Sequence, residues 1–199
     1  MIGLGTAFWL MVAFFALIGT LRGWTREIVA TSGLVLSLFA LNQFGFFLIS
    51  LLGAAAEAGA GGVDIDSVRR QQFFILSTVH LLIAFFSYQG PAFAGRAVRE
   101  RLRVRDSLQD KVLGALVGAV NGYLIVGTIW TFLEYQVGPA GYTQLPLGIP
   151  YPFDPMSVAR PILESPALAL MEKLPLPLLA PYLPFLVVVV FLFVIVVMI

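Results

Sequence analysis

The amino-acid sequence predicts an all-α integral membrane protein with five transmembrane helices. Of its 199 residues, 59% are hydrophobic and only 12% are charged, whereas a soluble domain carries about 25% charged residues. Several apolar runs approach the length of about 20 residues that an α-helix needs to cross a bilayer. The runs are continuous rather than alternating, which favours helices over the strands of a membrane β-barrel.

Five runs are long and apolar enough to be considered as spans. The predicted helices cover residues 2–21, 28–52, 73–88, 112–133 and 182–199. The third is short, and a kink at Gly90–Pro91 would allow it to continue. The last is rich in valine, but its 18 residues span roughly 27 Å as an α-helix, which is close to one hydrocarbon thickness.

The chain divides into three units. Residues 1–134 form a predicted four-helix membrane core, residues 135–181 a proline-rich extracytoplasmic connection, and residues 182–199 a C-terminal transmembrane helix. The connection holds ten of the twelve prolines. Within it, Asp154 and Ser165 each precede a proline, as an N-cap precedes Pro at N1. We therefore expect two short interfacial helices resting at the outer face.

Lysine and arginine are unevenly distributed among the four connections. The first and third connections hold eight of these residues, and the second and fourth hold four. Because basic residues are concentrated in cytoplasmic loops, we predict that the N-terminus lies outside and the C-terminus in the cytoplasm.

The third connection contains a basic segment, GRAVRERLRVRDSLQDK. One interpretation is an amphipathic helix lying on the anionic inner leaflet, which attracts basic residues at about 1 kcal/mol each. The other is an ordinary loop whose charges only set the topology. The arginines concerned are Arg96, Arg99, Arg101, Arg103 and Arg105.

Three glycines recur at every fourth position in DKVLGALVGAVNGYLIVG, namely Gly114, Gly118 and Gly122. In lipid, two helices gain little from hydrophobicity when they associate, so contact depends on close packing and on interhelical hydrogen bonds. Asn121 borders this glycine face and can donate such a bond, worth about 0.6 to 2 kcal/mol. The pattern predicts a helix-packing surface, either within the chain or for a partner.

A second short motif, GTLRGWTRE, joins the first two helices and predicts a tight antiparallel hairpin. Gly19 and Gly23 bracket the expected turn, and Arg22 and Arg26 lie at the predicted cytoplasmic interface. Glu27 begins the second helix, where the positive end of the helix dipole favours a carboxylate.

The motifs GTLRGWTREIVATSG and DKVLGALVGAVNG, together with ESPALALMEKLP, resemble the colicin V production protein family. The resemblance covers about residues 2–175, and this chain adds a fifth helix where the family generally has four. It implies a small protein of the bacterial inner membrane, linked genetically to toxin production and envelope upkeep, with no established enzymatic activity. It supplies no catalytic residue.

Two ionisable residues lie in or beside the predicted spans. His80 is the single histidine, in the middle of a helix, where an ionisable group is a functional candidate by default. It could relay a proton or ligate a haem or chlorophyll metal; alternatively, it is a neutral imidazole hydrogen-bonded between helices. Glu134 ends the fourth helix, and we expect it to be a hydrated residue at the membrane boundary.

The sequence offers little support for enzymatic chemistry. It has no cysteine, and it shows no phosphate-binding loop, no dinucleotide fingerprint and no set of metal ligands. We expect no cofactor and, at a net charge of +1, no nucleic-acid partner. The expected partners are membrane lipids and either a membrane protein or a second copy of the chain.

These observations leave three functions open. The first is a scaffold or partner-binding protein in toxin production, secretion and envelope function. The second is an accessory subunit of a larger respiratory or photosynthetic complex, which an added fifth helix would suit. The third is a small channel or transporter, which requires several polar residues to converge at the membrane midplane.

Overall fold

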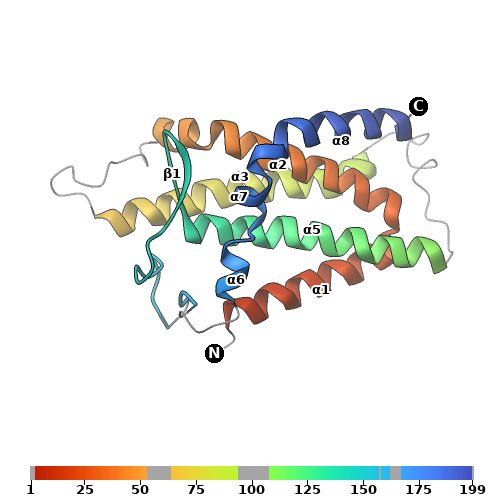
Figure 1. Ribbon diagram of the computed structural model, residues 1–199. Coiled ribbons are helices and arrows are strands. Elements are labelled where there is room, and N and C mark those ends of the chain that lie inside the picture. Colours follow the sequence, from red (N-terminus) through yellow and green to blue (C-terminus); the bar gives the residue numbers. More distant parts are fainter. Residues whose placement is uncertain (1–2, 53–63, 94–107, 157, 162–166, 199) are drawn as a thin grey trace.

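The computed structural model describes residues 3–52, 64–93, 108–156, 158–161 and 167–198 (Figure 1). Five of its helices are long and apolar enough to cross a membrane. The chain is therefore a multi-pass α-helical membrane protein, and the predicted fold class is confirmed. The basic segment from Arg96 to Arg105 lies outside the described residues.

The five long helices agree in order with the predicted spans. They are α1 (Leu4–Arg22), α2 (Trp24–Leu51), α3 (Ile65–Phe93), α5 (Leu108–Glu134) and α8 (Leu183–Met198). Helix α3 begins eight residues before the apolar run that predicted it. The added turns contain Arg69 and Gln72, which are buried, and Arg69 donates to the Pro150 carbonyl of the later connection at 3.1 Å. Apolar length alone therefore underestimates this helix.

Helix α1 packs mainly along α5, and the predicted pairing of the first two helices is largely wrong. The turn at Gly23 joins α1 directly to α2, but α1 contacts α5 far more extensively than it contacts α2. Helix α2 packs instead against α3 and α5. Helix α8 lies along α2, so that α1 and α8 occupy opposite edges of the bundle in Figure 1.

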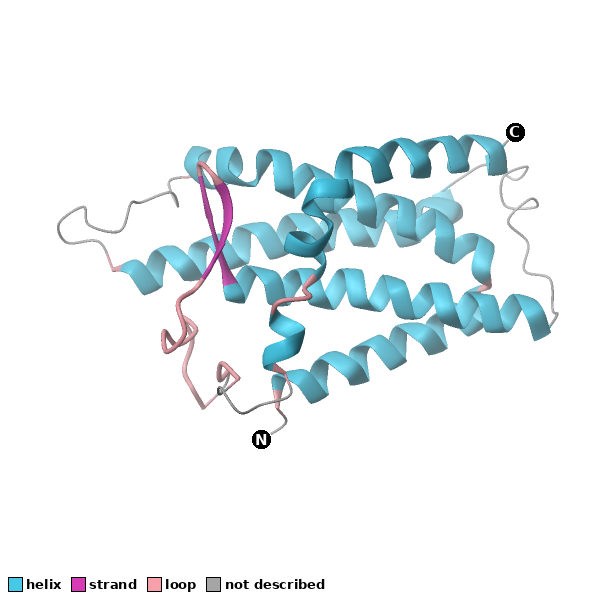
Figure 2. Ribbon diagram, viewed as in Figure 1, coloured by secondary structure: helices cyan, strands magenta, loops and turns pink. Residues whose placement is uncertain are grey.

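The connection after α5 begins with a hairpin that we did not predict. Strands β1 (Tyr135–Gly138) and β2 (Gly141–Gln144) pair antiparallel, and Gly141 has a φ of 105° at the turn. Figure 2 shows the hairpin crossing one end of the helices. Alternating Tyr135 and Val137, followed by a Gly-Pro-Ala-Gly turn, was the available signal.

The short helices of the connection agree only in part with those expected. Ser165 lies outside the described residues, and a short helix does lie in the segment that follows it. After Asp154 the described residues form a turn rather than a helix, and the Asp154 carboxylate accepts a bond from the Met156 amide at 2.9 Å. Further on come α6 (Leu168–Met171), α7 (Pro175–Leu179) and a 3₁₀ turn over Ala180–Tyr182.

Helix α7, which we did not predict, packs against the bundle. A Cβ at Gly127 of α5 would lie only 2.6 Å from Cδ of Pro175. Met171, Leu174 and Leu176 are at most 1% exposed. Helix α7 can approach α5 closely because Gly127, which lies about two helical turns before the end of α5, has no side chain.

Candidate functional site

The glycines of α5 provide the contact surface for α1. A Cβ added at Gly118 would meet the Phe15 carbonyl oxygen and would lie 2.9 Å from Cα of Gly19. A Cβ added at Gly122 would lie 2.8 Å from Cβ of Phe15, and one added at Gly114 would meet the Gly19 carbonyl oxygen. The missing side chains thus allow two backbones to touch, as close packing in lipid requires.

The turn between α1 and α2 lies against a residue of α5. Gly23 has a φ of 80°, a conformation that glycine adopts without strain. A Cβ at Gly23 would lie 2.6 Å from Oδ2 of Asp110, which is 6% exposed. Gly19 lies within α1 rather than at the turn, and its carbonyl accepts the Gly23 amide at 2.9 Å. The turn motif and the glycine motif therefore meet in space.

Glu27 is completely buried beside this turn and forms an ion pair with Arg22. The Arg22 Nε lies 2.6 Å from the Glu27 carboxylate, and Nη2 donates to the Tyr88 carbonyl at 3.1 Å. The Arg22 guanidinium also lies 4.6 Å from the centre of the Tyr88 ring. The Tyr88 hydroxyl donates to the second carboxylate oxygen of Glu27 at 3.0 Å. Helices α1, α2 and α3 are tied together at this point.

Asn121 adds α5 to the same cluster. Its amide donates to the Glu27 carboxylate at 2.8 Å and to the Glu27 carbonyl at 3.0 Å. Its own oxygen accepts a bond from the Thr31 hydroxyl at 2.7 Å. Asn121 thus makes interhelical bonds, all of them within the chain. We call Arg22, Glu27, Thr31, Tyr88 and Asn121 the inner cluster.

Two groups of predicted residues remain outside the inner cluster. Arg26 is partly exposed on α2, next to Glu27 in sequence. The five arginines between Arg96 and Arg105 lie outside the described residues, so their role on a membrane surface stays a prediction.

His80 is fully buried between helices rather than open to a cavity. Its Nδ1 lies 2.8 Å from the Ser37 hydroxyl of α2, and its ring meets Phe132 of α5 edge-on at 6.4 Å. Its other nitrogen, Nε2, makes no hydrogen bond within the described residues. This arrangement is the interhelical hydrogen bond that we considered as the alternative to a proton or metal site.

A second buried ion pair joins Arg160 of the connection to Glu134 at the end of α5. The two side chains are 8% and 0% exposed, and Nη2 of Arg160 lies 2.5 Å from Oε1 of Glu134. All five N–H groups of the guanidinium are used. Two donate to Glu134, and three donate to backbone carbonyls, those of Leu145, Pro146 and Ile149.

The expectation that Glu134 is a hydrated boundary residue is wrong. Its carboxylate accepts two bonds from Arg160, one from Gln144 and one from the Tyr151 hydroxyl, the last two at 3.0 Å. These four donors replace water around the carboxylate. Tyr151 in turn accepts a bond from the Trp130 indole at 2.9 Å. We call Trp130, Glu134, Gln144, Tyr151 and Arg160 the outer clamp.

Burial alters the acid–base behaviour of the outer clamp. Desolvation raises the pKa of the Tyr151 phenol above its ordinary value, and the negative charge of Glu134 raises it further. Tyr151 therefore stays protonated and keeps donating to Glu134. Desolvation likewise raises the pKa of Tyr142, whose hydroxyl donates to the Leu41 carbonyl at 3.1 Å. These bonds attach the connection to the bundle.

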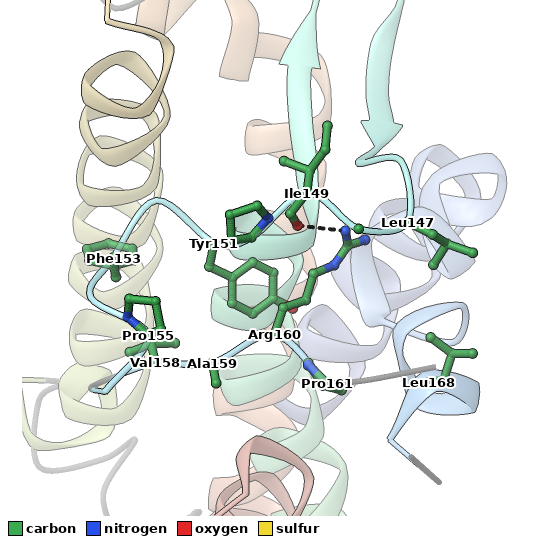
Figure 3. Close-up of a pocket in the computed structure, with 12 residues that line it drawn as sticks. Leu147, Ile149, Tyr151, Phe153, Pro155, Val158, Ala159, Arg160, Pro161 and Leu168 are labelled. Atoms are coloured by element: carbon green, nitrogen blue, oxygen red, sulfur yellow. Dashed lines mark hydrogen bonds between the residues drawn. The ribbon is translucent and has the colours of Figure 1, made fainter. Parts of the chain in front are cut away.

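An apolar hollow of about 400 Å³ opens beside the outer clamp. Figure 3 shows Tyr151 and Arg160 between two groups of apolar side chains that line it. The groups are Phe153, Pro155 and Val158 on one side and Leu147 and Leu168 on the other. Leu147 is 61% exposed. Because Arg160 uses all its donors within the chain, the hollow presents mainly apolar surface and rigid proline rings.

Sequence reasoning missed Arg160, Tyr151 and Tyr88. Each is far in sequence from the glutamate that it contacts, at separations of 26, 17 and 61 residues. A glutamate buried at a helix end requires a basic partner, but the burial of Glu134 cannot be read from the sequence. Within the described residues no group of three metal-ligating side chains comes together. What this arrangement can do chemically is hold two helix ends and an apolar surface in fixed positions.

The model of the family described as colicin V production protein matches residues 4–145. No curated protein and no solved structure matches the chain. The matched range contains the inner cluster, the glycine face and the β hairpin. Arg160 and α8 lie beyond it.

Proposed function

This chain belongs to the colicin V production protein family, and on that premise we propose that it is a non-enzymatic scaffold of the bacterial inner membrane. In this role it binds a partner protein that acts in toxin production and envelope function. The N-terminus lies on the extracytoplasmic side of this membrane and the C-terminus in the cytoplasm. The orientation follows from the basic residues of the first and third connections.

The observation that carries this proposal is the apolar hollow beside the outer clamp. Exposed apolar surface that is concave and partly lined by aromatic rings is typical of binding sites. Its walls are held by the Arg160–Glu134 ion pair and by prolines, including Pro155 and Pro161. A preformed site loses little entropy on binding. The occupant that we propose is an apolar segment of the partner polypeptide, at the extracytoplasmic surface of the inner membrane.

The pairing of the buried charges supports a scaffold over a transporter. Both buried glutamates have an arginine within 2.6 Å. Asn121 lies thirteen residues before Glu134, so the inner cluster and the outer clamp are separated by roughly 20 Å along α5. Between them, His80 is bonded to Ser37 and fully buried. A transport path would instead need polar groups that face a shared, hydrated passage.

Copurification from native membranes in mild detergent tests the proposal. Ala159 lines the hollow, so Ala159→Trp fills it, whereas Met156 is 72% exposed and does not line it. We expect a partner protein to accompany the wild-type chain and the Met156→Trp variant, and to fall at least tenfold with Ala159→Trp. Isolation of all three proteins as monomers without a partner would contradict a scaffold role.

A further inference from the structure

A second apolar groove, of about 310 Å³, lies between α2, α3 and α8. Gly33 brings α2 close to α3, because a Cβ there would meet the Ser87 hydroxyl. At Gly90, by contrast, a Cβ would find nothing within 4 Å. The groove therefore lies beside the close contact of α2 and α3 at Gly33, with open space at Gly90. Helix α8 supplies its remaining wall through Val187 and Val190.

The groove has an apolar lining although it contains two serines. The Ser32 hydroxyl donates to the Val29 carbonyl at 2.6 Å, and the Ser87 hydroxyl donates to the Ile83 carbonyl at 2.6 Å. Each proton is thus used within its own helix. An occupant needs no polar group to satisfy this surface, and water would find few partners in it.

The lining of the groove suits a chain of methylene groups, because its side chains are mostly apolar and its serine hydroxyls donate within their own helices. The three helices that form the groove are all candidate membrane spans. The medium around it is therefore lipid, and the nearest slender apolar chains are acyl chains.

We propose that this groove is a binding site for one acyl chain of a membrane phospholipid. Arg26 lies on the same face of α2 as Val29 and Gly33, one helical turn before Val29 and two before Gly33. Its positive charge marks the end of the groove at which the phosphate of that lipid lies. Because α8 falls outside the range matched by the family model, the site is created by the helix that this chain adds. It is separate from the hollow beside the outer clamp.

Photolabelling in liposomes tests this site. The probe is phosphatidylglycerol that carries a diazirine in one acyl chain, and labelled residues are identified by mass spectrometry of peptides. Val187 lines the groove, whereas its neighbour Val188 does not and is 56% exposed. We expect labelling to concentrate on the groove residues, to fall at least fivefold in Val187→Phe and to stay unchanged in Val188→Phe.

A second filling variant guards against misfolding. Ser32→Leu fills the groove from the opposite wall, and we expect it to lower the labelling by a similar factor. It provides the test if Val187→Phe does not fold. Labelling spread evenly over the exposed face of α1, for example at Leu10 and Phe14, with no change in either filling variant, would overturn the proposal. Crosslinks from the groove to a second polypeptide would overturn it as well.

Discussion

At the scale of single residues, the fold depends on two fully buried glutamates that are each paired with an arginine. Burial of an ion pair is not in itself stabilising, but removal of one partner leaves a charge without compensation. Each glutamate here also joins segments that are distant in sequence. Loss of either charge is therefore expected to weaken attachment of whole elements.

The Glu134→Gln variant tests the outer clamp. It leaves the Arg160 guanidinium buried at 8% exposure without a carboxylate, so we expect a loss of about 3 to 5 kcal/mol in the free energy of unfolding. The measurement is a denaturant titration in detergent. Glu172→Gln, at an exposed carboxylate, is the control and should stay within about 0.5 kcal/mol of wild type. Equal stability of the two variants would contradict the outer clamp.

Tyr151 gives the outer clamp a predicted dependence on alkaline pH. Burial and Glu134 raise its pKa above the ordinary 10.0, so the folded protein keeps the phenol proton that the unfolded chain loses. The stability from this group is thus present below pH 10 and is lost as the pH rises further. The slope is about 1.4 kcal/mol per pH unit.

The measurement is the free energy of unfolding at several values between about pH 9 and pH 11, for wild type and for Tyr151→Phe. Burial also raises the pKa of Tyr142 and of Tyr135, so the wild-type slope includes these groups. The difference in slope between the two proteins isolates Tyr151. Identical slopes above pH 10 would show that its phenol is not buried.

The individual partners could be predicted only in part. Asn121 was predicted to bond across a helix interface because an amide in lipid needs a partner, but the partner itself, Glu27, could not be named. We expected the Glu134 carboxylate to be hydrated, because the ends of membrane-spanning helices commonly reach the interface between membrane and water. Burial of its carboxylate depends on the ion pair with Arg160. No local pattern in the sequence specifies the fold of the connection that places Arg160 beside it.

At the scale of elements, the contact between α1 and α5 is a contact between backbones. Gly118→Leu places a side chain against the Phe15 carbonyl oxygen and Cα of Gly19, so α1 must move away. We expect a loss of at least about 1 to 3 kcal/mol in the free energy of unfolding. Helix propensity alone would change the stability in the opposite direction, because leucine favours a helix by up to about 1 kcal/mol over glycine.

The matched control for Gly118→Leu is Val120→Leu, at a position on the same helix that is 49% exposed. It should leave the free energy of unfolding within about 0.5 kcal/mol of wild type. A stable Gly118→Leu protein in the same titration would refute the proposed close approach of α1 and α5.

The long helices could be predicted because hydrocarbon thickness fixes the length of an apolar run. Their pairing could not, since the glycines of α5 show that some helix approaches there but not that it is α1. The polar start of α3 and the return of α7 against Gly127 depend on tertiary contacts. A hydropathy pattern contains no information about these contacts.

At the scale of the whole molecule, the proposed orientation can be tested with single cysteines. The chain has none of its own, and Leu108 and Met156 are 79% and 72% exposed. With intact cells whose outer membrane is made permeable, a membrane-impermeant maleimide should label Met156→Cys and not Leu108→Cys. Labelling of Leu108→Cys alone would invert the topology.

The measurement that tests the scaffold role most directly is photocrosslinking in native membranes from a photoreactive residue at Leu147, which lines the hollow and is 61% exposed. Thr143, an exposed residue of the nearby hairpin that does not line the hollow, is the control position. The account predicts a discrete adduct with one partner protein from Leu147, none from Thr143, and loss of the adduct when Ala159→Trp is added. Only lipid adducts at Leu147, or the same weak pattern at both positions, would contradict it.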